Sequence, residues 1–308
     1  MATKIFKNFQ LKKLETLLIP IDKLSDVLFD LEKQDAEEII ENRKLGITTP
    51  IIVTRPKDSN GNDIPTNPFD KLVFWIALSE QNAGNSCVSH TRIFHSLGGG
   101  ENFDHASNVK AAIIESLRKL RLTNLHADLT AIISRTKSYK KSLEDLLGIE
   151  INDRQVILED SLLPTKTVSA TINGKISDGV IYFHDFSILL HIAEMKKQIA
   201  YCSPSLLEVP NLRCTVQTLS LKGYLLERIL KIKGSLSSSR KRVQKLNNTI
   251  LFDSIFSKCG LNDEGRNRKA EFRAVISKIL THFINQKLIT SFEFTKKNGK
   301  FYSILINF

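Results

Sequence analysis

The spacing of apolar residues along the chain predicts two regions with the same order of elements. The first region begins at Pro68 with a helix whose apolar residues recur every three or four positions. After a short strand, Ser89 stands where the N-cap of a second, brief helix belongs, and the glycines at 98–100 end that helix. A third and longer helix opens at Asp104 or Ser107 and repeats the amphipathic pattern.

Strand-like stretches follow these three helices. Residues 124–133 and 154–160 read as strands and flank an insertion that is rich in lysine and serine. A hairpin comes next, with Asn173-Gly174 at its tip, and Asn-Gly is the strongest short hairpin signal. A helix at 186–198 and a loop at 203–210 close the region. Three helices followed by strands are typical of a winged helix, which we expect here.

The second region repeats this plan more clearly. Apolar spacing predicts a helix at 219–233, a short second helix at 250–260 and a third helix at 267–286. A polar, basic connector at 234–248 separates the first two helices. Two alternating strands then surround Asn298-Gly299, again an Asn-Gly turn. The sequence therefore predicts an α+β protein with two tandem winged-helix domains.

The residues before Pro68 are expected to form an N-terminal helical arm and linker, because they are too few to bury a sizeable core alone. Their helix-rich sequence is broken at Pro20 and stopped at Gly46, and a short strand candidate follows at 50–54. We expect three segments in all: an arm at 1–66, an N-terminal winged-helix domain at 67–210 and a C-terminal winged-helix DNA-binding domain at 211–308.

Charge is distributed unevenly over these segments. The chain has 44 Lys and Arg against 33 Asp and Glu, a formal net charge of +11. Residues 211–308 hold 19 basic and 6 acidic side chains, whereas the preceding 210 residues hold 25 basic and 27 acidic ones. A nearly neutral first part joined to a strongly basic last third indicates a polyanionic partner, which we expect to be double-stranded DNA.

Several classes of protein are excluded by simple patterns. No apolar run approaches the ~18–20 residues that span a bilayer, and the start lacks a signal sequence, so we expect a cytoplasmic protein without membrane contact. The four cysteines are scattered, with no Cys-x-x-Cys pair, and they are expected to be reduced thiols rather than disulfides or zinc ligands. No phosphate-binding loop or paired-histidine metal motif is present, so we expect no metal, no cofactor and no enzyme activity.

The candidate DNA-binding residues fall into four groups. In a winged helix the third helix enters the major groove and the wing contacts the backbone or minor groove. Arg266, Lys269 and Arg273 are spaced to share one face of the third helix of the second region, and Asn267 and Arg268 flank them. The other three groups are the wing tip (Lys296, Lys297 and Lys300), the basic connector (Arg240, Lys241, Arg242 and Lys245) and the third helix of the first region (Asn108, Lys110, Arg118 and Arg121).

The segments that form these elements resemble a known family, the tandem winged-helix plasmid replication initiators that bind repeated sites (iterons) at origins. The first region carries FDKLVFWIALSEQN, TRIFHSLGGG and AAIIESLRKLRLTNLHADLT, and the second carries LSLKGYLLERILKIK, ILFDSIFSKCG and FRAVISKILTHFINQKLITSFEF. The stretch from SLLP to SLLEVP is similar to the junction between the two domains of such initiators. The resemblance covers roughly residues 66–308, and the long N-terminal arm departs from it.

This resemblance implies a function. In such initiators both domains straddle one repeat, and the C-terminal third helix makes the main base contacts, which here implicates Arg266, Arg268, Lys269 and Arg273. The family also implies a homodimer that represses its own gene, and a host helicase or other replication proteins as partners. We expect a non-enzymatic plasmid or phage initiator; the alternatives are a winged-helix transcriptional repressor and, among enzymes, a DNA nicking endonuclease or primase.

Overall fold

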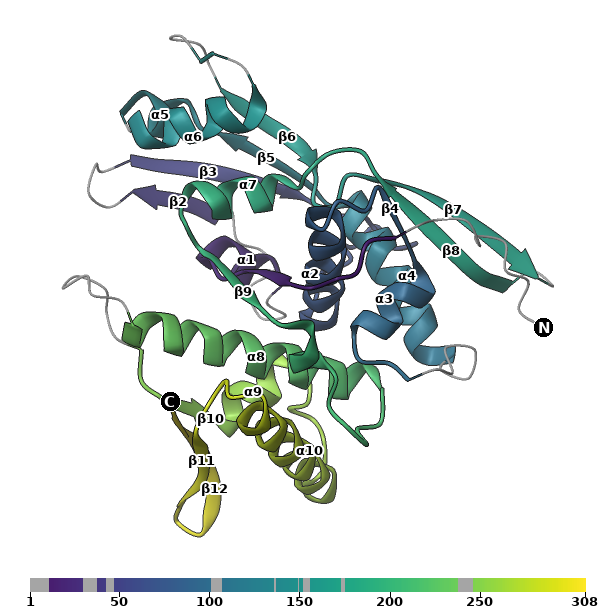
Figure 1. The fold of residues 1–308 in the computed structure, drawn as a ribbon, viewed down its shortest axis with the longest axis vertical. Helices are drawn as coiled ribbons and strands as arrows, with labels where there is room; N and C mark the ends of the chain where they lie inside the picture. The colour runs from purple at the N-terminus through teal and green to yellow at the C-terminus, as the bar shows by residue number, and fades with distance from the viewer. Residues whose placement is uncertain are drawn as a thin grey trace.

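The computed structural model describes residues 11–29, 38–42, 47–100, 107–135, 137–148, 150–151, 156–172, 175–237 and 246–308. Within these ranges the chain combines helices with antiparallel strands, which confirms the expected α+β class. Figure 1 shows the C-terminal helices and hairpin gathered at the bottom of the view, with the remaining elements above them.

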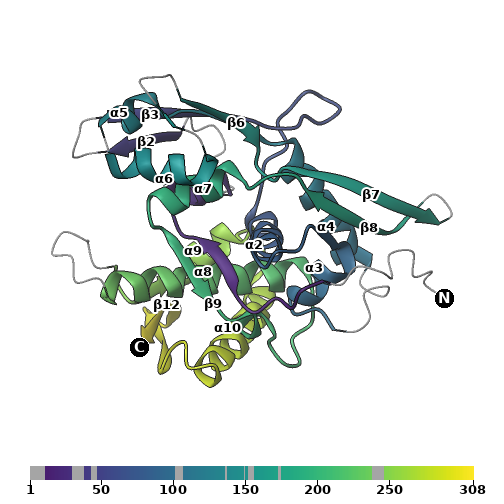
Figure 2. The same ribbon diagram turned by 45° about the horizontal axis from the view of Figure 1, so that its top comes forward.

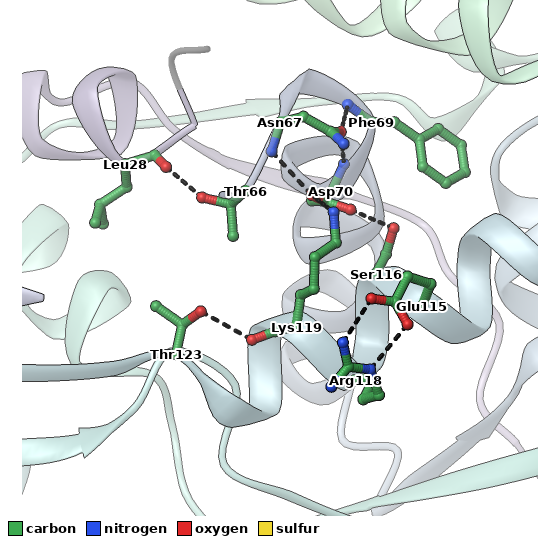
Figure 3. Close-up of polar contacts among 10 residues, drawn as sticks. All are labelled: Leu28, Thr66, Asn67, Phe69, Asp70, Glu115, Ser116, Arg118, Lys119 and Thr123. Atoms are coloured by element: carbon green, nitrogen blue, oxygen red, sulfur yellow. Dashed lines mark hydrogen bonds and ion pairs between the residues drawn. The ribbon is translucent and has the colours of Figure 1, made fainter. Parts of the chain in front are cut away.

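Helix α2 (Pro68–Asn82) is the central element of the first region, and its apolar side chains are buried. The helix begins at a capping box. Asn67 accepts hydrogen bonds from the backbone N–H groups of Phe69 and Asp70, while the Asp70 carboxylate accepts from the Asn67 N–H at 2.9 Å (Figure 3). Pro68 at the first helical position needs no hydrogen-bond acceptor, so the sequence fixes the start of this helix locally.

The elements after α2 follow the predicted order. They are β4 (Cys87–Ser89), α3 (His90–Ser96), α4 (Ser107–Leu122), and the hairpin of β7 (Thr165–Ile172) and β8 (Lys175–Phe183). The expected cap is confirmed, because the Ser89 hydroxyl accepts from the Arg92 N–H at 3.1 Å. Strand β4 pairs with β8, which gives a three-stranded sheet in the order β4-β8-β7.

A second sheet contains the strands expected at 50–54, 124–133 and 154–160 together with a fourth strand that was not predicted. Its order is β2-β3-β5-β6, from β2 (Glu38–Asn42), β3 (Ile47–Thr54), β5 (Asn124–Asp128) and β6 (Ile157–Ser161). The strand expected at 124–133 is wrong beyond Asp128. The Asp128 carboxylate accepts from the Thr130 N–H at 2.9 Å and so favours a helix start, and the chain continues as α5 (Thr130–Arg135) and α6 (Lys137–Leu147).

The N-terminal residues are paired with the first region rather than helical throughout. Strand β1 (Leu17–Pro20) is fully buried and pairs antiparallel with β9 (Ile199–Cys202), as Figure 2 shows, and the short helix α1 (Lys23–Leu28) follows it. The helix expected up to Gly46 is wrong at 38–42, where isoleucines pair with β3 as strand β2. Residues assigned to an arm thus supply strands to two sheets, while the domain boundaries themselves stay predictions.

The second region repeats the arrangement of the first. It comprises α8 (Val216–Ser237), β10 (Thr249–Leu251), α9 (Phe252–Lys258), α10 (Arg266–Asn285), β11 (Ser291–Lys297) and β12 (Lys300–Asn307). The sheet order is β10-β12-β11, so the short strand again pairs with the second strand of the hairpin. Asn298 and Gly299 have φ values of 52° and 74°, as a two-residue hairpin turn requires.

Helices α2 and α8 join the two regions. They pack directly against each other: a Cβ on Gly223 would lie 3.4 Å from the Leu72 side chain, an ordinary contact distance. An ionic cluster lies beside this contact. Lys71 Nζ is 3.0 Å from Asp26 Oδ1 and 2.7 Å from Glu227 Oε1, and Lys231 bridges the same two carboxylates. The segment between the regions holds α7 (Ile188–Met195) and a short 3-10 helix, η2 (Pro204–Leu207).

Candidate nucleic-acid interface

The first turn of α10 contains only polar side chains, because the first buried apolar residue of the helix is Phe272. Phe272 and Ile276 are buried in the core, whereas Arg266, Asn267 and Arg268 are exposed. Gly265 is the N-cap and provides no side-chain acceptor, so the first N–H groups of α10 stay available to a ligand. The positive end of the helix dipole adds to the arginine charges, which favours an anion at this end.

The α10 side chains differ in how firmly neighbours hold them. Arg268 Nη1 is 2.6 Å from Glu271 Oε2, and Lys269 Nζ donates to the Asn262 carbonyl at 2.5 Å. The side chains of Arg266 and Asn267, in contrast, have no hydrogen-bond or ion-pair partner among the residues that the structure describes. In the first turn of α10, Arg266 and Asn267 therefore have donors open to a ligand.

The hairpin of β11 and β12 places further cations next to α10. Lys296, Lys297 and Lys300 are all exposed, and Figure 1 shows the hairpin projecting from the body of the region. The Arg273 guanidinium lies 4.9 Å from the centroid of the Phe301 ring, and Lys296 Nζ lies 4.9 Å from the same centroid. The structure thus brings together a residue of α10 and a residue of the hairpin that the sequence placed in separate groups.

Phe301 is the residue of this surface that sequence reasoning missed. The residue is 41% exposed although its ring makes edge-on contacts with Phe252 and Phe294. The available signal is the run of lysines and aromatic residues on either side of the Asn-Gly turn, which strand periodicity alone does not single out. The basic connector with Arg240, Lys241, Arg242 and Lys245 lies outside the described residues.

In the first region, the corresponding candidates lie on α4, where the basic side chains are half-buried or paired with a carboxylate. Asn108 is exposed, and Lys110 and Arg121 are half-buried. Arg118 donates two hydrogen bonds of 2.8 Å to Glu115, which hold the pKa of that carboxyl below its usual range (Figure 3). The next lysine, Lys119, is buried and paired with Asp70 of α2, so it is part of the core.

Two further features of the described residues concern metal ions and membranes. Among these residues, no group of three or more histidine, cysteine, aspartate or glutamate side chains is arranged to hold a metal ion. None of the helices in the described ranges is long and apolar enough to cross a membrane.

Comparisons with known proteins give few relatives. No family model matches the sequence, and no curated protein matches it. A crystal structure of domains 2 and 3 of RctB, in selenomethionine form, is similar with a TM-score of 0.43 and 13% identity over 93% of this chain and 96% of that one. A second structure of RctB domains 2-3 gives a TM-score of 0.43 and 12% identity over 91% and 94% of the two chains. Both TM-scores lie below 0.5, so residue roles are assigned from the geometry of this chain.

Proposed function

We propose that the chain is a sequence-specific duplex DNA-binding protein that initiates replication of a plasmid or phage by binding repeated sites at the origin. The observation that carries this proposal is the exposed start of α10, where Arg266 and Asn267 have open donors, next to a hairpin with exposed lysines at its tip. In the proposed reading each region is a winged helix, and together they read two successive stretches of one duplex.

The side chains at the start of α10 suit the edges of base pairs. B-DNA has a major groove ~12 Å wide that admits a helix, and arginine donates paired hydrogen bonds to O6 and N7 of guanine. Asparagine pairs in the same way with adenine. Arg266 and Asn267 therefore supply sequence preference, whereas the wing lysines bind phosphates and supply affinity that depends on salt.

Origin opening follows from binding energy in this proposal, without a chemical step. Several copies on adjacent repeats bend the DNA, at a cost on the order of 1–6 kcal/mol per short site, and the charged contacts offset that cost. Bent and strained DNA separates more easily at a neighbouring AT-rich stretch, where a host helicase is then recruited. The chain itself has no catalytic role in this scheme.

The test is a binding selection from a random duplex DNA library with the full chain. Two winged helices on one face of the duplex predict a composite site whose half-sites lie ~10 bp apart. Enriched sites that occur as direct repeats beside an origin support the initiator, whereas a palindrome upstream of a gene favours a transcriptional repressor. A selection without any enriched sequence contradicts specific recognition.

A cleavage assay separates this proposal from the enzyme alternatives. Supercoiled DNA carrying the selected site is incubated with the protein and Mg²⁺ or Mn²⁺, and nicked circles are quantified. Unchanged supercoiled DNA at stoichiometric protein is expected for a binding protein. Metal-dependent nicking at the site, or primer synthesis on single strands, overturns the non-enzymatic role.

A further inference from the structure

We propose that Phe301 is a positioning residue that holds Arg273 of α10 and Lys296 of the wing as one binding site for a DNA phosphate. This inference rests on the proposed function and names the phosphate subsite that couples the helix to the wing. Its basis is the shared ring, since the Arg273 guanidinium and Lys296 Nζ each lie 4.9 Å from the Phe301 centroid.

A β-bulge creates this arrangement. The β11–β12 register pairs Thr295 with Ser303, and an unbroken ladder would then set Tyr302 opposite Lys296. The register shifts between Thr295 and Lys296, so that Phe301 comes to lie opposite Lys296. A bulge re-aims one side chain to the other face of the strand. Here it directs the Phe301 ring toward α9 and α10.

The Phe301 ring is held by two aromatic neighbours, and the residue is nevertheless partly exposed. Phe252 of α9 lies 6.1 Å from Phe301 with the rings at 73°, and Phe294 of β11 lies 6.1 Å away at 88°, both edge-on contacts. Since 41% of Phe301 nevertheless remains exposed, these contacts fix the ring without covering it. A fixed ring face is a suitable support for a cation.

Two cations on one ring form an anion site. Each cation lies 4.9 Å from the same ring centroid, so the two charges are at most about twice that distance apart. This separation is within the ~10 Å Debye length at 0.1 M salt, so the two charges repel each other. A phosphate bound by both relieves that repulsion. A guanidinium stacked on a ring keeps the N–H donors at its edge free, so Arg273 binds the phosphate without leaving Phe301.

The opposite side of the same strand provides a matched control. Lys297 Nζ lies 5.3 Å from the centroid of the Tyr302 ring, and Tyr302 is 43% exposed, much like Phe301. Among the described contacts, however, no cation of α10 lies on the Tyr302 ring. Tyr302→Leu therefore removes an exposed wing aromatic and one cation–ring contact but leaves the proposed coupling between helix and wing intact.

The experiment measures affinity of the full chain for its selected duplex site over a series of salt concentrations. Phe301→Leu keeps an apolar side chain but removes the ring, whereas Phe301→Tyr keeps the ring. We expect Phe301→Leu to weaken binding about 3- to 30-fold, the range of a cation–ring contact, and to lower the salt dependence by about one phosphate. Phe301→Tyr and Tyr302→Leu are expected to stay within about twofold of the unchanged protein.

A double-mutant cycle tests the coupling without changing the ring. With Phe301 present, we expect the double mutant Arg273→Met/Lys296→Met to lose less affinity than the sum of the two single losses. With Phe301→Leu, we expect the two losses to be additive. A single neutral methylphosphonate linkage is then placed at each phosphate of the site in turn. At one phosphate, we expect this change to weaken binding of the unchanged protein but not binding of Phe301→Leu.

The proposal is wrong if Phe301→Leu binds with the same affinity and salt slope as the unchanged protein. It is also wrong if Phe301→Tyr or Tyr302→Leu loses as much affinity as Phe301→Leu. Arg266→Ala distinguishes these outcomes from failure of the proposed function. If Arg266→Ala loses sequence preference while Phe301→Leu changes nothing, DNA recognition by α10 stands and only the coupling through Phe301 is wrong.

Discussion

The third helices of the two regions have the same core and different surfaces. When the first residues of α4 and α10 are matched, the buried Ile113, Leu117 and Leu120 correspond to Phe272, Ile276 and Ile279, which are also buried. Each helix follows a short helix and precedes a hairpin whose second strand pairs with a three-residue strand. One arrangement of helices and strands is therefore used twice in the chain.

The outward positions are where the two helices diverge. Ser107 and Ile114 of α4 stand where α10 has Arg266 and Arg273. Val109, which is buried in the first region, stands where α10 has the exposed Arg268. Two positions keep their residue type, because Asn108 matches Asn267 and Lys110 matches Lys269. Packing constrains the residue types of the buried face of each helix but not those of the exposed face. Basic residues that suit DNA can therefore gather on the exposed face of α10.

The largest expected effect concerns the junction that holds the two regions together. Lys71→Met leaves Asp26 and Glu227 with one lysine instead of two, although Glu227 is only 9% exposed. Removing one partner of a fully buried ion pair costs about 3–5 kcal/mol. Because Lys231 still contacts both carboxylates and the Asp26 side chain is 46% exposed, we expect a cost of about 2–3 kcal/mol, which a chemical unfolding curve measures. Arg118→Met removes a more exposed ion pair and is expected to cost less than about 1 kcal/mol. Equal effects of the two changes would show that Lys71 stabilises the junction no more than an exposed ion pair does.

A smaller effect separates the two third helices directly. Arg266→Ala is expected to weaken binding to the selected site by ~1–3 kcal/mol and to relax preference at one base pair. Ser107→Ala at the matching position of α4 is expected to change neither. Lys241→Ala in the basic connector is expected to weaken all DNA sequences alike, because phosphate contacts carry no sequence information. Equal losses for Arg266→Ala on every DNA sequence would place the base contacts elsewhere.

The pH dependence of stability probes a second contact between the regions. Lys222 of α8 is buried and donates to the carbonyls of Leu97 and Leu207, and burial lowers its pKa to about 8. Between this value and the ordinary lysine pKa of 10.5, the unfolded chain binds more protons, so the free energy of unfolding rises with pH. Relative to Lys222→Met, we expect a gain of about 2 kcal/mol from pH 7 to pH 9.5. Parallel pH profiles of the two proteins would contradict the lowered pKa.

The smallest expected effect compares the two hairpins. Lys300→Ala at the start of β12 is expected to lower the slope of log affinity against log salt by about 1, because one phosphate contact is lost. Lys166→Ala on β7 is also a change of an exposed lysine and is expected to alter the slope less. Affinity titrations at four salt concentrations measure both slopes. A larger change for Lys166→Ala would indicate that the first hairpin is the main DNA contact.

Local patterns predicted most helices of both regions and the second hairpin. The second helix expected at 250–260 is wrong at its start, where Ile250 and Leu251 pair with β12 as strand β10. Helix α10 and the hairpin around Asn298-Gly299 were predicted within one or two residues at most boundaries, because 3.6-residue spacing and an Asn-Gly turn are signals carried by neighbours in sequence. The pairing of β1 with β9 could not be predicted, since Leu17 and Cys202 are 185 residues apart in the sequence. The pairing of β3 with β5 and of β5 with β6 is also distant in sequence, and β2 was expected to be helical.

The candidate site was predictable in its residue types and less so in its geometry. The positions of Arg266 and Asn267 on the exposed face of α10 follow from the apolar spacing. The contact of Arg273 and Lys296 with the same ring depends on a one-residue bulge in the β11–β12 pair. No local pattern in the sequence predicts this shift of register. The Arg118–Glu115 pair was overlooked, although its spacing of three residues on α4 was visible in the sequence.

The most direct test of DNA reading by α10 is chemical protection of guanine N7, which faces the major groove. The selected duplex is treated with dimethyl sulfate in the presence of the full chain, of Arg266→Ala and of Ser107→Ala. We predict protection of guanines in one major-groove segment by the full chain, loss of that protection with Arg266→Ala at saturating protein, and no change with Ser107→Ala. Guanines that stay reactive under the unchanged protein, or protection that persists with Arg266→Ala, would contradict base reading by α10.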